Sequence, residues 1–373
     1  AVIGCGILAW SLMTAACGLA GNFWHLFLAR IGVGAGEAAL LPGATSILAD
    51  YFPPARRGMA LGVFSAGIFL GSGIALIVGG LLIRVLEGVQ VSWPLLGPLH
   101  AWQVVFVAVG LPGVLVALLM LTVAEPPRLG IQPSAMAGTR RGVPLAIVAR
   151  YFHRNATTVT CHALGFTLLA FASYAGTAWI PTLFIRAHGW TATQVGVRFG
   201  IVALLVGPLG SVAGGWLADR IESRGDRNGK FKVGLLSALG VAVTAVGYPL
   251  AHSASLSFAL LIPFLFFVSF VWALAPASLQ EIMPNQMRGL ATALYTGFLN
   301  LVGLGLGPTS VAVVADYLLP VRGRLDLAMA IVVPVAALAS AVLFRLGYRP
   351  YLRTLERVHS WHEVSAQPGG GKH

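Results

Sequence analysis

Two ionisable residues, Arg30 and Glu37, stand inside a long apolar segment of the chain at residues 24–49. Seven residues cover close to two turns of an α-helix, so a helix here would project both side chains from one face, about 10 Å apart. Charged groups in apolar surroundings are costly and usually face a polar cavity or an ionic partner. The pair therefore predicts one of two arrangements. Either Arg30 binds an anionic group and Glu37 exchanges a proton on the wall of a polar pathway, or both residues form static ion pairs between helices.

A second set of candidate residues lies in apolar segments of the C-terminal half that carry no Lys, Arg, Asp or Glu away from their ends. The set combines aromatic rings with hydroxyl and amide groups, and its members are Tyr174, Thr177, Trp272, Tyr295 and Asn300. The amide of Asn300 needs a hydrogen-bond partner, which either a cavity or a neighbouring helix supplies. Charge on one wall and aromatic rings on another would suit an amphipathic or anionic solute.

The composition places both sets in a membrane protein. Of the 373 residues, 57% are hydrophobic and 10% are charged, and the mean hydropathy is +0.84. Soluble domains carry about 25% charged residues. A helix needs roughly 20 apolar residues to cross a bilayer. The sequence offers such segments at about 1–20, 24–49, 58–83, 102–123, 158–186, 193–218, 233–251, 255–281, 289–316 and 326–346. The expected fold class is an all-α membrane protein.

Other chemistries have little support in the sequence. The three cysteines lie in apolar segments, which argues against a disulfide framework. No phosphate-binding G-x-x-x-x-G-K-[S/T] loop occurs, and no nucleophile, base or metal ligands cluster. We therefore expect no enzyme, no cofactor and no metal.

The positions of the charges predict how the chain lies in the membrane. The net charge is +12, and most of the 24 Lys and Arg residues fall in alternate connections, at residues 50–57, 125–157, 219–232 and 282–288 and in the C-terminal tail. Cytoplasmic loops of membrane proteins are enriched in Lys and Arg. We therefore expect these connections and both chain ends on the cytoplasmic side of an inner or plasma membrane. Because the loop positions explain the charge, we expect no nucleic acid as a partner.

One loop sequence occurs twice in the same register. The stretch "DYFPPARRGMALGVF" begins at Asp50, and "EIMPNQMRGLATALY" begins at Glu281. The repetition predicts two parallel repeats. In each copy Pro breaks the preceding helix, Arg reaches a phosphate headgroup or a carboxylate, and Gly admits another backbone. A plain connecting loop is the alternative. The matched residues are Pro53, Arg57 and Gly58 in the first copy and Pro284, Arg288 and Gly289 in the second.

A second motif links the chain to a known family. The loop "GGWLADRIESRGDRNGK" carries the pattern G-x-x-x-D-R-x-x-x-R at Gly215, Asp219, Arg220 and Arg224. This pattern resembles the inter-helix loop signature of the major facilitator superfamily, in its second-repeat copy. The stretches "EPPR", "GWTATQVG", "PASLQ" and "MPNQMRG…NLVGLGLGP" are similar to the spinster-like branch. The resemblance covers about residues 1–350.

The resemblance implies twelve membrane helices in two pseudo-symmetric bundles, of which this chain carries ten. The repeat register places residue 1 near the start of the third helix, so the resemblance implies an N-terminal truncation; a ten-helix protein is the alternative. The implied domains are residues 1–124 as the remainder of the N-terminal bundle, 125–157 as a cytoplasmic linker, 158–346 as the C-terminal bundle and 347–373 as a cytoplasmic tail.

The resemblance also implies a function. Members are secondary active transporters that move a small solute by alternating access, and spinster-like proteins are associated with sphingolipid or lysolipid export. We expect a monomer driven by protons or by the solute gradient, with a non-transporting receptor or scaffold as the alternative. In this family the loop acid faces a helix N-terminus in the opposite half. Asp219 would then face the start of the third segment near Arg57 and Gly58, unless it caps its own loop.

Overall fold

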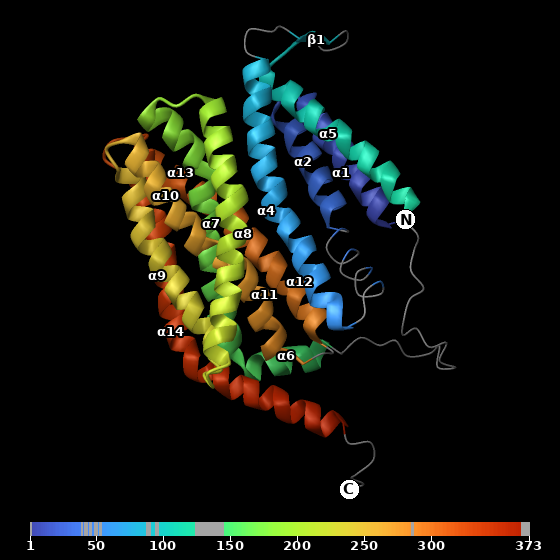
Figure 1. Ribbon diagram of the computed structural model, residues 1–373, viewed down its shortest axis with the longest axis vertical. Coiled ribbons are helices and arrows are strands. Elements are labelled where there is room, and N and C mark those ends of the chain that lie inside the picture. Colours follow the sequence, from blue (N-terminus) through green and yellow to red (C-terminus); the bar gives the residue numbers. More distant parts are fainter. Residues whose placement is uncertain are drawn as a thin grey trace. The chain divides into compact units, whose positions relative to one another are not determined.

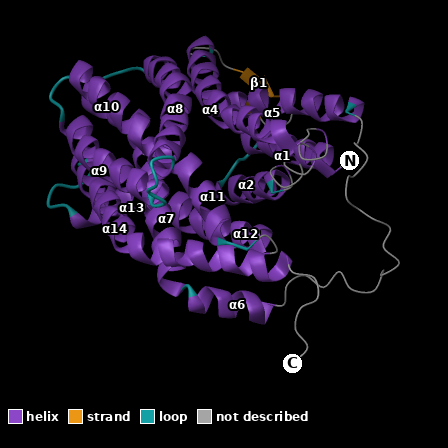
Figure 2. Ribbon diagram, turned by 60° about the horizontal axis from the view of Figure 1, so that its bottom comes forward, coloured by secondary structure: helices purple, strands orange, loops and turns teal. Residues whose placement is uncertain are grey.

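The computed structural model describes residues 2–38, 40, 44, 47, 51, 54–86, 91–93, 97–123, 145–284 and 287–366. Over these residues the regular structure is helical apart from one short hairpin (Figures 1 and 2). The chain forms two compact units. Unit 1 comprises Ala1–Gly138 and Ala192–Ile201, and unit 2 comprises Thr139–Thr191 and Val202–His373.

Unit 1 contains mostly long apolar helices. Their described bounds are α1 (Val2–Gly18), α2 (Phe23–Glu37), α4 (Pro54–Val85) and α5 (Ala101–Leu119), and the 3-10 turn η1 (Met120–Thr122) extends α5. Between α4 and α5 the strands β1 (Val91–Trp93) and β2 (Gly97–Leu99) pair antiparallel, with Val91 opposite Leu99. The sequence pattern did not predict this hairpin.

Small residues allow the helices of unit 1 to pack at backbone distance. A Cβ atom added at Gly110 of α5 would lie 2.6 Å from the amide nitrogen of Ala15 in α1. One added at Gly36 of α2 would lie 2.8 Å from the amide nitrogen of Trp10, also in α1. Interfaces between membrane helices are enriched in such small residues. One face of α2 is therefore fixed against α1, which determines where the other faces of α2 point.

Unit 2 is a bundle in which α7, α9, α10 and α14 lie side by side (Figure 1). The first ten residues of α8 belong to unit 1 and the remainder to unit 2. The segments η3 and η4 are π-helical. The bounds are α6 (Leu145–Arg154), α7 (Ala156–His188), α8 (Ala192–Glu222), α9 (Gly229–Leu250), α10 (Ala254–Val268), α11 (Phe270–Ile282), α12 (Arg288–Leu299), η3 (Asn300–Leu306), α13 (Gly307–Val313), η4 (Val314–Leu318) and α14 (Leu325–Ala366).

An aromatic core joins α7, α9 and α14 in unit 2. Phe166, Phe231 and Phe344 are fully buried, and the ring of Phe344 lies 4.6 Å from that of Phe166 and 5.6 Å from that of Phe231. Glycines make room for these rings, since a Cβ atom added at Gly234 would lie 3.0 Å from Phe344. Aromatic rings provide large apolar contact areas, so this cluster holds the three helices together.

The helices agree with the expected membrane segments. Within the described residues, eight helices are long and apolar enough to cross a membrane, and Val2–Gly18 is a shorter apolar helix. The expected segment at 24–49 is described as a continuous helix only to Glu37. These observations and the family comparison below confirm the all-α fold class, whereas the twelve-helix numbering and the domain ranges drawn from the resemblance remain predictions.

The last helix is longer than expected. The sequence placed its end at residue 346, but α14 continues to Ala366. The reason is a second apolar stripe with helical spacing: Tyr351, Leu355 and Val358 are buried, whereas Arg353 and Arg357 are exposed. Apolar residues at i, i+4 and i+7 lie on one face of a helix. This extension of α14 is therefore amphipathic.

The short helix α6 is attached to the bundle by a buried tyrosine. The hydroxyl of Tyr151 donates to the carbonyl oxygen of Ile282 at 2.5 Å. We expect Tyr151→Phe to lower the free energy of unfolding by about 1–3 kcal/mol, because the buried carbonyl loses its donor. Thermal unfolding in detergent micelles measures this change. Tyr317→Phe is the control, because Tyr317 is 78% exposed and should be neutral.

The same variant should change the dependence on alkaline pH. Burial raises the pKa of Tyr151 to about 12, above the ordinary value of about 10. The contribution of the neutral hydroxyl is therefore complete below about pH 10 and is lost as the pH rises through 12. The stability difference between the native protein and Tyr151→Phe should shrink over that window. A difference that stays constant from pH 9 to 12 would contradict the assignment.

Candidate functional site

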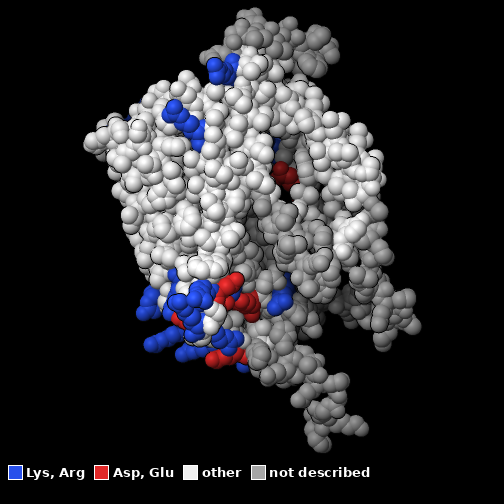
Figure 3. Space-filling view, in the orientation of Figure 1, with Lys and Arg blue, Asp and Glu red and all other residues white. Residues whose placement is uncertain are grey.

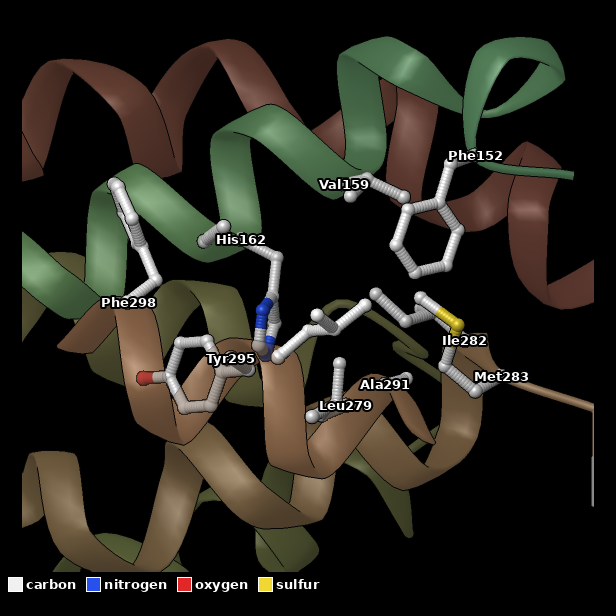
Figure 4. Close-up of a pocket in the computed structure, with 11 residues that line it drawn as sticks. Phe152, Val159, His162, Leu279, Ile282, Met283, Ala291, Tyr295 and Phe298 are labelled. Atoms are coloured by element: carbon white, nitrogen blue, oxygen red, sulfur yellow. The ribbon is translucent and has the colours of Figure 1, made fainter. Parts of the chain in front are cut away.

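An apolar cavity of about 130 Å³ lies inside unit 2, where α6, α7, α11 and α12 meet (Figure 4). Its walls include Phe152, Leu279, Ile282, Leu294 and Phe298. Two polar residues, His162 from α7 and Tyr295 from α12, join this lining. An apolar pocket with a few polar groups is the usual form of a binding site for a small molecule.

His162 connects α7 to α11 and has a defined orientation. Its side chain is buried, and its Nε2 atom lies 3.1 Å from the carbonyl oxygen of Ala275 and 3.0 Å from Oγ of Ser278. A carbonyl oxygen only accepts hydrogen bonds, so Nε2 carries a proton in this arrangement. In the neutral ring Nδ1 is then an acceptor. The sequence pattern does not distinguish His162, because a single histidine in an apolar segment has no characteristic spacing.

The hydroxyl of Tyr295 is buried without a hydrogen-bond partner in the described part of the chain. Its ring lies 5.2 Å from that of His162, and Figure 4 shows its hydroxyl pointing away from the centre of the cavity. Tyr174 lies near it, and Tyr174 contacts Trp272 edge-on at 5.6 Å. Three of the residues selected from the sequence, Tyr174, Trp272 and Tyr295, therefore lie in one region together with His162.

The other two residues of that set differ from these three. Thr177 donates its hydroxyl to the carbonyl of Ser173 at 2.7 Å, so this donor is used within α7. Asn300 is exposed at the first position of η3, and the described residues include no hydrogen-bond partner for its amide. A role as a link between helices therefore has no support in the described region.

The π-helix η3 follows from its sequence and shapes the wall next to Tyr174. Pro308 has no N–H to donate to the preceding turn, which favours local widening of the helix. Gly303 and Gly307 then pack against α7, where an added Cβ would lie 3.4 Å from the ring of Tyr174 and 3.0 Å from the carbonyl of Phe171, respectively. These glycines therefore serve close packing. π-helical turns often occur at functional sites.

In unit 1, Arg30 and Glu37 share one face of α2. Both are exposed, whereas Ala29, Val33 and Gly36 are buried. At 100° per residue the two charged side chains lie about 20° apart around the helix axis and roughly a quarter turn from the face packed on α1. Neither forms an ion pair with any described side chain. The static ion-pair alternative therefore lacks support in the described region, and the pathway role remains a prediction.

A buried charged network lies at one end of unit 2. The Nζ atom of Lys230 lies 2.7 Å from Oε2 of Glu222 and 2.6 Å from Oε1 of Glu281, and its side chain is only 7% exposed. Tyr351 donates its hydroxyl to the other oxygen of Glu281 at 2.6 Å. The network joins the C-terminal ends of α8 and α11 and the N-terminal end of α9 to the interior of α14. In the sequence, Lys230 does not differ from the other cations of this loop.

In contrast to the Lys230 network, the charged residues of the predicted loop motif lie on the surface. Asp219, Arg220 and Arg224 are exposed, and the carboxylate of Asp219 bonds to none of the described residues, so capping of its own loop has no support there. A Cβ atom at Gly215 would meet Ala273 at an ordinary 3.8 Å, so the fold of unit 2 does not require glycine at this position. Whether Asp219 faces the third segment remains a prediction.

The side-chain contacts of the repeated loop are described only in its second copy. The Nε atom of Arg288 donates to the carbonyl of Met283 at 3.2 Å, so this Arg closes its own loop. No described atom would come within 4 Å of a Cβ added at Gly289, so the expected close approach of another backbone is not observed there. The side chain of Arg57 and the surroundings of Gly58 lie outside the described residues.

Basic side chains gather at one end of unit 2 (Figure 3). They come from α6, from the connection between α8 and α9, and from the extension of α14. This is the clustering that the alternating loops predicted, while the cytoplasmic orientation of this end remains a prediction. Loop acids pair with part of the charge: Lys232 contacts Asp226, and this hydrogen bond holds the pKa of Asp226 below its ordinary value.

Comparison with known proteins identifies transporters. A family model described as the Major Facilitator Superfamily matches residues 1–308. An MFS-type efflux pump of Mycolicibacterium smegmatis is 28% identical over 360 residues, which cover 95% of this chain and 78% of that protein. Human protein spinster homolog 1 is 29% identical over 236 residues, which cover 60% of this chain and 42% of that protein.

A solved structure has the same fold. It is a bacterial homolog of the human lysosomal transporter spinster, in an inward-facing and unoccupied conformation, with a TM-score of 0.70 and 23% identity over 96% of this chain and 83% of that one. The expected major facilitator fold and the resemblance to the spinster-like branch are confirmed by these matches. The matched proteins are transporters rather than enzymes.

Proposed function

The chain belongs to the major facilitator superfamily, and from this membership we propose that it is a secondary transporter for a small amphipathic or anionic solute. It would move this solute by alternating access, driven by protons or by the solute gradient. Within unit 2 the candidate residues for this function are those of the apolar cavity and the aromatic residues beside it, and within unit 1 they are Arg30 and Glu37.

The observation that carries this proposal is the orphaned hydroxyl of Tyr295 beside an apolar cavity. A buried hydroxyl without a partner costs about 1–3 kcal/mol, and Tyr295 bears this cost in the described part of the chain. A solute with a polar group would supply the missing bond on the side of the Tyr295 ring that faces away from the cavity, and its apolar part would extend past the ring into the cavity. Trp272 and Tyr174 would add ring surface for the apolar part.

The charged residues of α2 support the anionic part of the proposal. A guanidinium forms strong bonds to carboxylates and phosphates, and Arg30 is exposed without an ion pair to any described acid. The Mycolicibacterium relative is described as an efflux pump, which favours export over uptake. Anionic lysolipids are therefore suitable probes, with a sphingoid base as an amphipathic cation and a uronate as a polar anion for comparison.

Removal of one oxygen atom tests the proposal. Tyr295→Phe should raise the unfolding temperature of the ligand-free protein slightly, because it removes an unsatisfied buried hydroxyl. It should also weaken stabilisation by the best probe about tenfold in apparent affinity, the equivalent of about 1.4 kcal/mol. The measurement is a thermal-shift titration with lysophosphatidylglycerol, sphingosine and galacturonate.

Tyr248→Phe is the matched control. The hydroxyl of Tyr248 is also buried without a partner in the described residues, but it lies in α9 and does not line the cavity. Both variants should stabilise the free protein, and only Tyr295→Phe should weaken the probe. Equal probe affinity in the two variants would contradict the proposed site. A transport measurement in proteoliposomes distinguishes the alternative function. A receptor or scaffold would bind the probe without moving it across the membrane, whereas a transporter would move it.

A further inference from the structure

A second pocket in unit 2 is polar and basic. It has a volume of about 130 Å³ and lies where α6 ends, α7 begins and the extension of α14 passes. One water needs about 10–15 Å³ of such volume, so this pocket has room for a group of several heavy atoms. The residues used below are Arg154, Asn155, Thr158, Arg353, Thr354 and Arg357, all of which line it.

Three guanidinium groups surround this pocket without a carboxylate in its lining. Arg353 and Arg357 are four residues apart on α14, so they project from the same face of the helix, and Arg154 ends α6. Like charges at this spacing repel each other. Glu356 is the nearest acid in sequence, but it does not line the pocket and forms no ion pair with a described residue. The arrangement therefore favours a bound anion.

The pocket floor is built from buried polar groups. Thr158 and Thr354, 2% and 1% exposed, share a hydrogen bond of 2.8 Å, and Thr354 also donates to Oδ1 of Asn155. Arg357 donates through Nη1 to the same amide oxygen at 3.0 Å and to the carbonyl of Arg154 at 3.2 Å. These bonds fix one guanidinium in place before any ligand arrives, and such preorganisation favours binding.

The N-terminus of α7, the positive end of its helix dipole, lies at the same pocket. Asn155 is the N-cap residue of α7, but its side chain makes no capping bond. The first backbone bond of the helix runs from Val159 to Asn155 at 2.9 Å. The amides of the three residues between them therefore precede the intrahelical ladder. The end of this 33-residue helix favours negative charge.

We propose that this pocket binds a phosphate group. Guanidinium forks match phosphate oxygens in bidentate geometry, and helix amides supply further donors. The pocket lies at the end of unit 2 where basic side chains gather (Figure 3). The phosphate would come either from the headgroup of an anionic lipid or from a soluble phosphate, and both present the same group to the three guanidiniums.

The test uses the purified full chain in detergent at about 0.15 M salt, where diffuse surface charge is screened. The variant Arg154→Gln/Arg353→Gln removes two pocket cations whose side chains make no hydrogen bond in the described structure. The matched control Arg150→Gln/Arg349→Gln removes one charge from α6 and one from α14, each four residues earlier and outside the pocket. Binding is followed by thermal shift in titrations with phosphatidylglycerol and with inorganic phosphate.

We expect the pocket variant to weaken the preferred probe at least tenfold and the control to stay within about twofold, since a charge-assisted bond is worth about a tenfold change or more. If inorganic phosphate competes with phosphatidylglycerol, the pocket binds soluble phosphate in addition to the lipid headgroup. Binding of phosphatidylglycerol without such competition would identify a lipid headgroup site. Equal losses in both variants, or no binding of either probe by the native protein, would overturn the proposal.

Discussion

Replacement of Lys230 by Met is expected to destabilise the protein by about 3 kcal/mol. The variant keeps the length of the side chain but leaves Glu222 and Glu281 next to each other without a cation. Removal of one partner from a buried ion pair costs about 3–5 kcal/mol. The lower end of that range applies because Glu281 remains 36% exposed and keeps part of its hydration.

The effect should be visible in a thermal unfolding curve. A domain of about this size loses about 2–4 °C in its midpoint for each kcal/mol, so Lys230→Met should lower the midpoint by about 6–12 °C in detergent micelles. Lys232→Met is the matched control. Lys232 pairs with Asp226 on the surface, with 42% of its side chain exposed, and such pairs contribute about 0–1 kcal/mol.

A rescue variant separates the stability lost through unpaired charge from the stability lost through altered packing. Lys230→Met combined with Glu222→Gln and Glu281→Gln removes the stranded carboxylates, and it should recover most of the lost stability because an uncharged set costs less to bury. Tyr351 retains an amide oxygen or nitrogen as its neighbour in this variant. If Lys230→Met and Lys232→Met lose the same small amount, the network does not hold the helix ends together.

The membrane helices could be predicted because lipid leaves few alternatives. A long apolar segment must satisfy its backbone internally, so it forms a helix. The expected segment at 102–123 and the observed Ala101–Thr122 agree within one residue for this reason. The hairpin at Val91–Leu99 was missed because its two strands are three residues each, too short for a detectable alternation.

The end of α14 was missed for a different reason. Hydropathy falls after residue 346, so a search for membrane segments stops there. The periodicity continues at Tyr351, Leu355 and Val358, and counting apolar residues at helical spacing would have revealed the extension. This signal was present in the sequence, and it matters because the same stretch carries the arginines of the polar pocket.

The candidate site in unit 2 could be predicted only in part. Side chains that combine an aromatic ring with a polar atom are uncommon in apolar segments, so Tyr174, Trp272 and Tyr295 are distinctive in the sequence. His162 is not, because its partner Ser278 lies 116 residues away in the sequence. Lys230 could not be distinguished from other loop cations, because its burial depends on the packing of α8, α11 and α14 around it.

Glu37→Gln is expected to separate proton coupling from solute movement. The variant cannot release a proton, so accumulation driven by an imposed pH gradient in proteoliposomes should fall to the level of empty liposomes. Exchange of labelled for unlabelled probe needs no net proton movement and should continue at a similar rate. This expectation follows from the position of Glu37 on an exposed face of α2 without an ion pair to a described residue.

Arg30→Gln should instead weaken both accumulation and exchange, since a charge-assisted bond to an anionic group is worth about 1.5–3 kcal/mol, or roughly 10- to 150-fold in affinity. His25→Gln is the control on the same helix, because His25 is exposed and bonds only within its own turn in the described structure. The different responses of the two charged positions distinguish a coupling residue from a binding residue. Full accumulation in the double variant Arg30→Gln/Glu37→Gln would show that neither residue takes part in the mechanism. The apolar cavity of unit 2 would then have to account for solute binding by itself.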